Sequence, residues 1–278
     1  MSGYLIAHMP AVRLIIFLGL LAGVAGWEMI APRRRRMLSR KRRWPHNLGI
    51  SVVNTLSLRV LLPAAAVGFA AWAEQKGWGL FNTMPLPLWL VVILSITLLD
   101  LTVYLQHVMF HALPLLWRVH RVHHTDMDFD VTTALRFHPV EIILSMMVKL
   151  AAIAILGAPA IAVLFFEIIL NATAMFNHAN ASLPAAIEPI VRLLVVTPDF
   201  HRVHHSVIRA ETNSNFGFNA PWWDWIFGTY RAQPSAGHAT MRIGLEEFRD
   251  PAQERLDRLL LQPWRKAKQD APLAGPWS

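Results

Sequence analysis

The chain has 278 residues, of which 54% are hydrophobic and only 16% are charged, and its mean hydropathy is +0.37. Soluble domains carry roughly 25% charged residues, so these values favour a protein with several membrane spans over a globular one. The sequence contains no cysteine, which excludes disulfides, iron–sulfur clusters and thiol nucleophiles. Any bound metal must therefore be held by histidine, carboxylate or amide groups.

The formal net charge of +8 is concentrated near one end of the chain. Residues 33–43, RRRRMLSRKRR, carry eight of the twenty-six Lys and Arg side chains. This basic block follows an apolar segment and contains no aromatic residue that could stack on a base. It therefore predicts a cytoplasmic anchor under the positive-inside rule, with some attraction for anionic lipid headgroups, and no nucleic-acid partner.

Five apolar segments follow one another along the sequence. The first is centred on residues 14–27, and the second covers about 48–73 and should cross the membrane with some kinking at Pro63. A third begins near Pro85 and continues as a helix to about Ala112, beyond the thickness of a bilayer. Residues 140–156 and 158–178 predict a helical hairpin, and 183–197 an interfacial helix. With this topology the third and fifth segments end on the same, cytoplasmic side.

The predicted fold is all-α: an integral membrane protein with four transmembrane helices in two hairpins and a cytoplasmic helical cap. We divide it into an N-terminal transmembrane region (1–94), a central histidine-rich domain (95–231), which the family resemblance given below implies to be catalytic, and an amphipathic C-terminal tail (232–278).

Histidines gather in motifs that suit a metal site. Residues 107–124 contain five of them and end in HRVHH, and the same five letters return at 201–205. Helical positions i and i+4 lie on one face, so His107 and His111 should aim at one point, while the adjacent histidines of each HRVHH diverge and could serve two ions. The predicted ligands are His107, His111, His120, His123, His124, His178, His201, His204 and His205.

Other polar residues share helical faces with these ligands. Asp100 and Tyr104 precede His107 and His111 at helical spacing, so we expect them beneath the ligands, with Asp100 accepting an imidazole N–H. Glu167, Asn171 and His178 form a similar face, which we expect to look toward the site; Lys149 is a candidate partner for Glu167.

Imidazole ligands admit zinc, copper, iron or nickel. Nine clustered histidines exceed the four ligands of a structural zinc site and the three of a catalytic one. Two redox metals that bind dioxygen use this number better.

The motifs resemble those of the fatty acid hydroxylase / sterol desaturase superfamily of membrane diiron enzymes. The similarity covers about residues 95–231 and rests on HxxxH, HxxHH, an apolar hairpin and HxxHH. It is supported by WRVHRVHH (117–124), RFHPVE (136–141), NHAN (177–180), TPDFHRVHH (197–205), NSNFGFN (213–219) and WDWIFGTY (223–230). Phe216 stands where the family usually has Tyr.

The resemblance implies a membrane enzyme that uses two iron ions and dioxygen to hydroxylate or desaturate a lipid such as a fatty acyl chain or a sterol-like molecule. The nine histidines would be the iron ligands, and His138, Asn177, Asn215 and Asp224 would lie close to them or to the substrate. Electrons would come from a ferredoxin or a cytochrome b5-like protein with its reductase, and the expected location is a bacterial inner membrane. The alternative is a membrane protein that binds or transports metal without oxidase activity.

Overall fold

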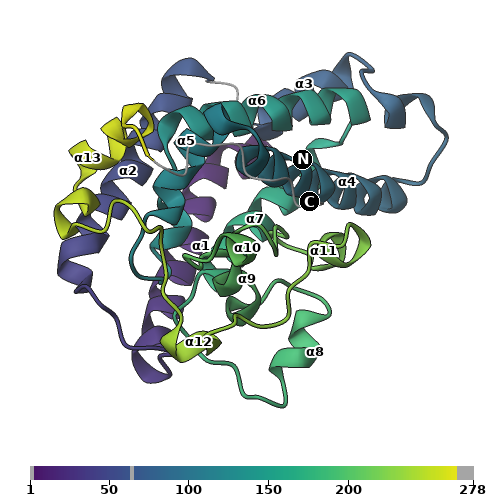
Figure 1. The fold of residues 1–278 in the computed structure, drawn as a ribbon. Helices are drawn as coiled ribbons and strands as arrows, with labels where there is room; N and C mark the ends of the chain where they lie inside the picture. The colour runs from purple at the N-terminus through teal and green to yellow at the C-terminus, as the bar shows by residue number, and fades with distance from the viewer. Residues whose placement is uncertain (1–2, 63–65, 268–278) are drawn as a thin grey trace.

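The computed structural model describes residues 3–62 and 66–267, and this part of the chain is built from helices without a β-strand (Figure 1). The long helices are α1 (Gly3–Ile30), α2 (Arg40–Leu61), α3 (Ala66–Gln75), α4 (Leu88–Ala112), α5 (Pro114–His124), α6 (Pro139–Leu156) and α7 (Ala160–Asn177). The short ones are α8 (Glu188–Arg192), α9 (Pro198–His204), α10 (Arg209–Thr212), α11 (Trp222–Ile226), α12 (Gly237–Thr240) and α13 (Leu256–Leu261), with 3-10 turns η1 (Leu80–Thr83), η2 (Thr133–Leu135), η3 (Pro251–Glu254) and η4 (Gln262–Trp264).

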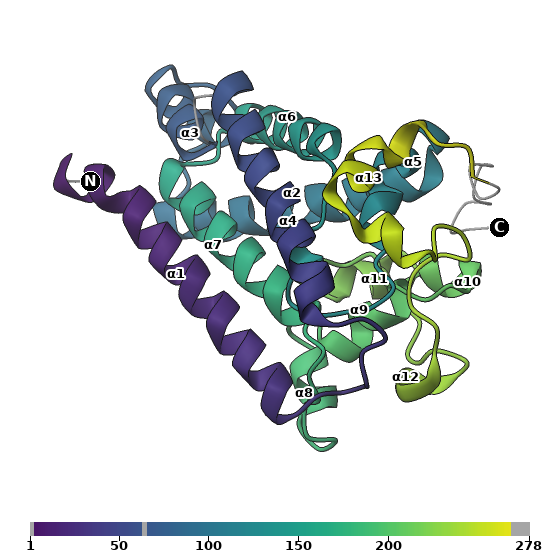
Figure 2. The ribbon, with the colours of Figure 1, turned by 90° about the vertical axis from the view of Figure 1, so that its left-hand side faces the viewer.

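Five segments are long and apolar enough to cross a membrane: Ala11–Ile30, Arg40–Thr83, Leu88–Ala112, Pro139–Leu156 and Ala160–Asn177. The second of them includes residues 63–65, which lie outside the described ranges. The all-helical, membrane-type architecture thus agrees with the sequence analysis, whereas the count of four spans and their orientation remain predictions. Figure 2 shows α1 and α7 running side by side.

The second apolar segment was predicted to form one kinked helix, and the structure differs. The structure contains two helices here, α2 ending at Leu61 and α3 beginning at Ala66. Leu62 already has non-helical angles (φ −134°, ψ 67°). It precedes Pro63, whose ring disfavours the helical conformation of the residue before it, and Pro63 itself lies outside the described residues.

The core of the membrane-type region joins α3, α4, α6 and α7 around Leu99, Ile153 and Phe166. The α6–α7 turn is tight because Gly157 adopts φ +70° after the last residue of α6. The segment after α3 passes directly over it, so close that a Cβ on Gly79 (φ +92°) would lie 2.0 Å from the Gly157 nitrogen. Glycine is required at both positions.

The basic block and the C-terminal segment both take part in the protein interior. The fully buried Arg43 donates to Asp126 through two hydrogen bonds (2.7 and 2.6 Å) and to Asp130 (2.6 Å). Nearby, Arg136 forms an ion pair with Glu254. Burial alone would raise the pKa of Asp126, but Arg43 and Arg136 lower it to about 2. The interpretation of the block as a membrane anchor is therefore incomplete, because Arg43 holds the buried 125–136 segment in place.

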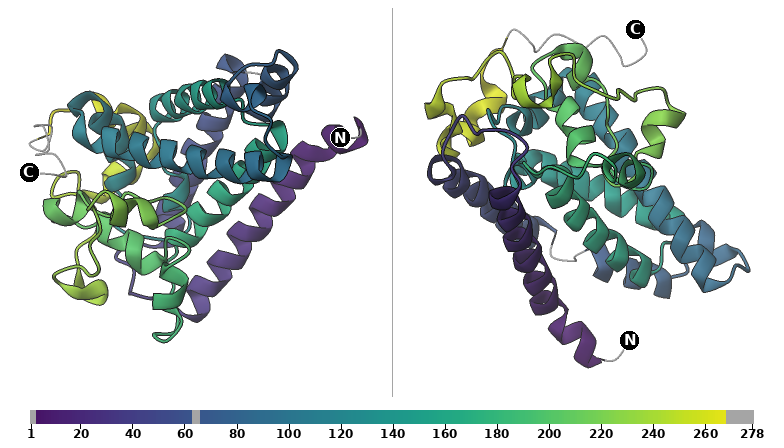
Figure 3. Two further views of the ribbon diagram at one scale, coloured as in Figure 1. Left: turned by 90° about the vertical axis from the view of Figure 1, so that its right-hand side faces the viewer. Right: turned by 90° about the horizontal axis from the view of Figure 1, so that it is seen from below.

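The C-terminal segment lies against α2 and α5 (Figure 3). Leu259 is fully buried with Ile50 and Val122, and Thr125 donates to the side chain of Gln262. Residues 251–264 therefore cover the outer face of the helix that carries His120, His123 and His124.

Candidate metal centre

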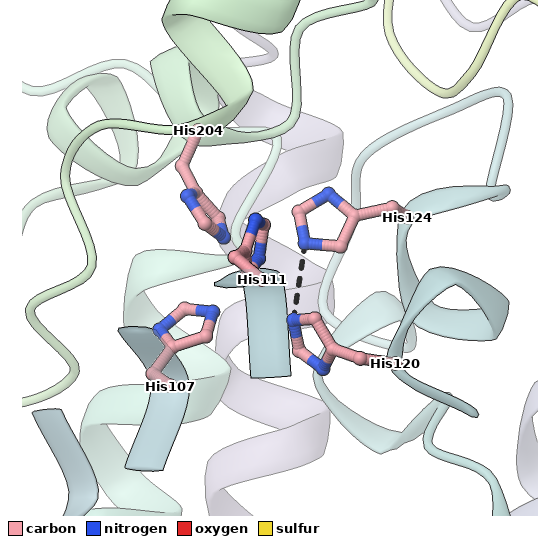
Figure 4. A group of neighbouring side chains, drawn as sticks. All are labelled: His107, His111, His120, His124 and His204. Atoms are coloured by element: carbon pink, nitrogen blue, oxygen red, sulfur yellow. Dashed lines mark hydrogen bonds between the residues drawn. The ribbon is translucent and has the colours of Figure 1, made fainter. Parts of the chain in front are cut away.

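The nine histidines predicted as ligands are all buried. Seven lie on α4, α5 and α9, and His178 and His205 directly follow α7 and α9. Together the nine form two compact groups, in each of which one ligand atom per residue lies within 4.8 Å of all the others. The first group is His107, His111, His120, His124 and His204, and the second is His123, His178, His201 and His205. Figure 4 shows the five rings of the first group turned toward one another.

Neighbouring histidines of each HRVHH motif belong to different groups. His123 and His124 diverge at the end of α5, as do His204 and His205 at the end of α9. The rings of His124 and His205 stack with centroids 4.7 Å apart, so the two groups adjoin. This agrees with the expectation that one motif can serve two ions.

Four rings of the first group use Nδ1 to donate a hydrogen bond away from the group. The acceptors are Phe216 O for His107 (2.8 Å), Asn213 Oδ1 for His111 (3.3 Å), Glu141 Oε1 for His120 (2.6 Å) and Ser214 O for His204 (2.8 Å). An imidazole that donates through Nδ1 presents the lone pair of Nε2. Each outward bond thus fixes both the tautomer and the direction of a potential ligand atom.

The inward nitrogens of the first group lack the partners that buried polar atoms need. Nε2 of His107, His111 and His204 is buried without a hydrogen-bond partner among the described residues. The Nε2 atoms of His120 and His124 lie 3.2 Å apart. Two imidazole nitrogens bound at ~2.1 Å to one ion lie ~3.0 to ~3.4 Å apart for angles between 90° and tetrahedral. The observed spacing and the unpartnered nitrogens both fit a shared metal ion.

In the second group the Nε2 atoms are spaced as in the first, but fewer of its rings donate a hydrogen bond away from the group. The Nε2 atom of His178 lies 3.1 Å from Nε2 of both His123 and His201. Its Nδ1 donates to Ala174 O (2.8 Å), whereas Nδ1 of His123 and His201 and both nitrogens of His205 are buried without a partner in the described ranges. This group also fits a metal ion.

Two aromatic rings cover one side of the second group. Phe137 stacks on His123, with centroids 4.3 Å apart and planes 12° apart. Phe129 lies 5.5 Å from His178 and 5.0 Å from His205. Both phenyl rings come from the segment between α5 and α6, so this segment closes the group on one side.

Burial keeps these rings in the neutral form that binds metals. Loss of hydration lowers the pKa of His178 to about 4 and of His204 to about 3, and it lowers the pKa values of His123, His201 and His205 well below the ordinary 6.5. Near neutral pH no proton has to leave these rings before a metal binds.

The prediction for Asp100 is wrong in its detail. Its carboxylate accepts hydrogen bonds from Asn219 Nδ2 (2.8 Å), the Ala220 nitrogen and Trp223 Nε1 (2.9 Å), not from an imidazole. Asp100 precedes His107 by two helical turns, about 10 Å along α4, and at that level it faces the chain that leads into α11. It therefore anchors that segment.

Tyr104 likewise supports the ligands indirectly. Its hydroxyl lies 2.8 Å from Thr229 Oγ1, and its ring meets the edge of Phe216. The Phe216 carbonyl is the acceptor for His107, so Tyr104 packs against the residue that orients a ligand.

The carboxylate that does contact a candidate ligand is Glu141, which the sequence analysis did not single out. Its Oε1 accepts from His120 Nδ1 at 2.6 Å. The available signal was its place in RFHPVE, three residues after His138. His138 begins α6: its Nδ1 accepts from the Val140 nitrogen, and its Nε2 donates to Leu260 O (3.1 Å). His138 thus starts the helix that presents Glu141 and contacts the C-terminal segment.

Asn177, Asn215 and Asp224 all hold the 213–219 segment, whose carbonyls accept from ligand histidines. Asn177 donates to Phe218 O (2.9 Å), and Asn215, at φ +55°, donates to the carbonyls of Phe200 and Arg231. Asp224 accepts from the nitrogens of Phe216 (2.8 Å) and Gly217 (2.6 Å). Burial raises the pKa of Asp224 to about 6.

The polar face predicted on α7 does not point toward the histidines at the position of Glu167. This carboxylate forms ion pairs with Arg13 (2.7 Å) and Lys149 (3.2 Å), which confirms the Lys149 pairing. Asn171 donates to the Glu167 carbonyl within α7. Eleven residues, or about 16 Å of helix, separate Glu167 from His178.

Comparison with known proteins places these motifs in a family. The model of the fatty acid hydroxylase family matches residues 92–229. The chain is 29% identical over 175 residues to an ornithine lipid hydroxylase of Rhizobium tropici (63% of this chain, 49% of that protein). It is 27% identical over 135 residues to the alkylglycerol monooxygenase of Homo sapiens (48% and 29%), and 26% identical over 174 residues to a very-long-chain aldehyde decarbonylase of Oryza sativa subsp. indica (61% and 64%).

The aligned part of the chain spans about half the length of the first of these relatives and less than two thirds of the other two. No solved structure matches the chain. The matched residues 92–229 contain all nine histidines of the two groups. Residues 92–229 therefore belong to the fatty acid hydroxylase family.

Proposed function

We propose that this protein is an integral-membrane diiron oxygenase that hydroxylates or desaturates a lipid drawn from the bilayer. The observation that carries the proposal is the pair of adjoining buried histidine groups with unpartnered nitrogens facing inward. The relatives named as a lipid hydroxylase and a monooxygenase support an oxygen-inserting reaction. The histidines of each group would hold one iron ion, and His120 would be oriented by Glu141.

Bound iron would supply the activation of dioxygen that imidazole side chains cannot provide. Hydroxylation inserts one oxygen atom of O₂ into a C–H bond and reduces the other to water, which consumes a pair of electrons and a pair of protons. A ferredoxin or a cytochrome b5-like protein with its reductase is the proposed electron donor. The protein's own contribution is to hold neutral rings in fixed directions and to exclude water from them with Phe129 and Phe137.

The arrangement supports an oxygenase over a metal transporter. A transport path needs ligands spread along the direction of movement. These nine histidines are instead all buried and lie in two compact groups. The proposed site faces the cytoplasm, at the ends of α4 and α7, in a bacterial inner membrane.

The proposal is tested in cells that express the full chain or its His120→Ala or His204→Ala variant. Lipid mass spectrometry should find a lipid that has gained one oxygen atom, or lost two hydrogens, only with the unmodified chain, and the variants should contain less iron after purification. His46→Ala is the matched control, because His46 belongs to neither group. Full product formation by the His120 and His204 variants, or metal uptake without oxygen consumption, would contradict the proposal.

A further inference from the structure

A second feature of the molecule lies apart from the histidines. An open hollow of about 1030 Å³ is formed where the chain leaves α1 and turns toward α2. Residues 28, 29 and 32–39 line it together with Ala239, and none of the nine histidines does. Four of the lining residues are the consecutive arginines 33–36, so the hollow is strongly basic.

The one carboxylate that lines the hollow is already engaged elsewhere. Glu28 is fully buried, and its Oε2 accepts from Arg40 at 2.7 Å. Its Oε1 accepts from the backbone nitrogens of Val131 (2.7 Å) and Asn180 (2.9 Å). Because both oxygens have partners outside the row of arginines, Glu28 does not neutralise any of the four.

The four arginines divide into an engaged pair and an available pair. Arg33 forms an ion pair with Asp199 (3.0 Å), and Arg34 donates to Met241 O (2.8 Å). Arg35 and Arg36 are exposed, and within the described ranges neither makes an ion pair or a hydrogen bond. A guanidinium group offers a planar pair of donors that matches phosphate oxygens.

The backbone on either side of the available pair is fixed. Arg34 donates its backbone N–H to Asn180 Oδ1 (3.1 Å), and Met37 and Leu38 donate theirs to Asp128 (3.0 and 2.7 Å). The segment that carries Arg35 and Arg36 is therefore positioned before any ligand arrives, which reduces the entropy lost on binding.

Apolar side chains adjoin the basic hollow. Ile30 is the last residue of the candidate span Ala11–Ile30 and is 86% exposed, Met29 is 70% exposed, and Met37 is 61% exposed. A hollow that is cationic at the end of a span and apolar at its edge matches a ligand with an anionic head and hydrocarbon tails. We propose that the Arg33–Arg36 hollow binds the phosphate headgroup of an anionic membrane lipid, with its acyl chains along the end of α1.

The test uses the purified full chain in detergent, titrated with dioctanoyl-phosphatidylglycerol, dioctanoyl-phosphatidylcholine or inorganic phosphate. Phosphatidylglycerol should bind most tightly. The double variant R35Q/R36Q should weaken its binding about 25-fold, at roughly fivefold for each arginine near a headgroup. The matched control is K41Q/R42Q, which removes the same charge from exposed positions of the same basic block outside the hollow.

Equal weakening in the two double variants would overturn the proposal, because it would indicate general attraction to the basic block. Equal binding of the two lipids, or of inorganic phosphate and phosphatidylglycerol, would also overturn it. Arg35 and Arg36 make no ion pair or hydrogen bond with the part of the chain that the structure describes, so an unchanged unfolding temperature is expected for both variants. The readout is lipid binding alone, so its failure leaves the proposed oxygenase function untouched.

Discussion

The two histidine groups are built from the same motifs but are held in different ways. In the first group, hydrogen bonds from Nδ1 to backbone, amide and carboxylate oxygens orient four of five rings. In the second, His178 alone has such an outward bond among the described residues, so packing against Phe129 and Phe137 is the main restraint on the other rings. The first group is also packed against aromatic rings, those of Phe216 and Trp117, in addition to its hydrogen bonds. Hydrogen bonds determine the tautomer and direction of a ring, whereas packing restricts only its position. We therefore expect the first group to be the more rigid metal site.

The largest expected effect comes from removing a ligand from one group at a time. If each group holds its own ion, His107→Ala should abolish product formation and reduce the iron content from about two ions per chain to about one, as should His178→Ala. Elemental analysis of the purified variants measures the content. Loss of both ions in either variant would show that the groups do not bind independently.

Loss of Arg43 should disturb the second group through Phe129, which packs against that group and lies in the segment that Arg43 holds. Arg43→Ala leaves Asp130 buried without its cation and leaves Asp126 with Arg136 alone, at a cost of about 3–5 kcal/mol. Thermal unfolding in detergent should show this loss, and the second ion should be released more readily than the first. Arg42→Ala, at an exposed position, should change stability by less than about 0.5 kcal/mol.

Glu141→Gln tests the hydrogen-bonded support of the first group. The amide oxygen can still accept from His120 but carries no charge, so we expect metal affinity or activity to fall about 10- to 100-fold. Metal titration monitors the affinity. Glu246→Gln, an exposed carboxylate in the C-terminal part, is the control, and an equal effect in both variants would contradict the assigned role of Glu141.

Acid should destabilise the metal-free protein. The pKa of His178 is lowered by burial to about 4, so between the unfolded value of 6.5 and pH 4 the unfolded state binds a proton that the folded state does not. The free energy of unfolding should fall by about 1.4 kcal/mol per pH unit for each such histidine as the pH decreases through this window. The pKa of His204, in the first group, is lowered to about 3, so its contribution to the free energy of unfolding should keep falling until the pH reaches about 3. Stability that is constant from pH 7 to 5 after chelation would contradict buried neutral rings.

The smallest expected effect is that of Phe137→Leu. Losing the stacked ring over His123 should cost about 0.5–1.5 kcal/mol of packing. If packing is what holds the second group, metal titration should show binding weakened there more than at the first group, where Phe137 lies farther away, 6.3 Å from His120. Equal weakening at both groups would remove the distinction between them.

The sequence by itself determined most of the long helices and the candidate ligands. Apolar runs of span length predict helices because a bilayer leaves no other partner for the backbone, and the i, i+4 and HRVHH spacings predict imidazoles on shared faces. These local rules pointed to all nine histidines that the structure collects in the two groups, and the resemblance of the motifs to known ones indicated the family. The domain division and the ligand roles remain predictions.

Only the tertiary structure decided which residues support those ligands. Spacing along α4 made Asp100 the candidate carboxylate, yet the contact with His120 comes from Glu141, on a different helix. Hydropathy made the basic block an anchor, yet Arg43 turns inward to Asp126, 83 residues along the chain. Periodicity describes the face that one helix offers, but a buried polar group bonds to whatever the packing of other elements brings within about 3 Å. That packing is a property of the whole chain and cannot be read from any one of its segments.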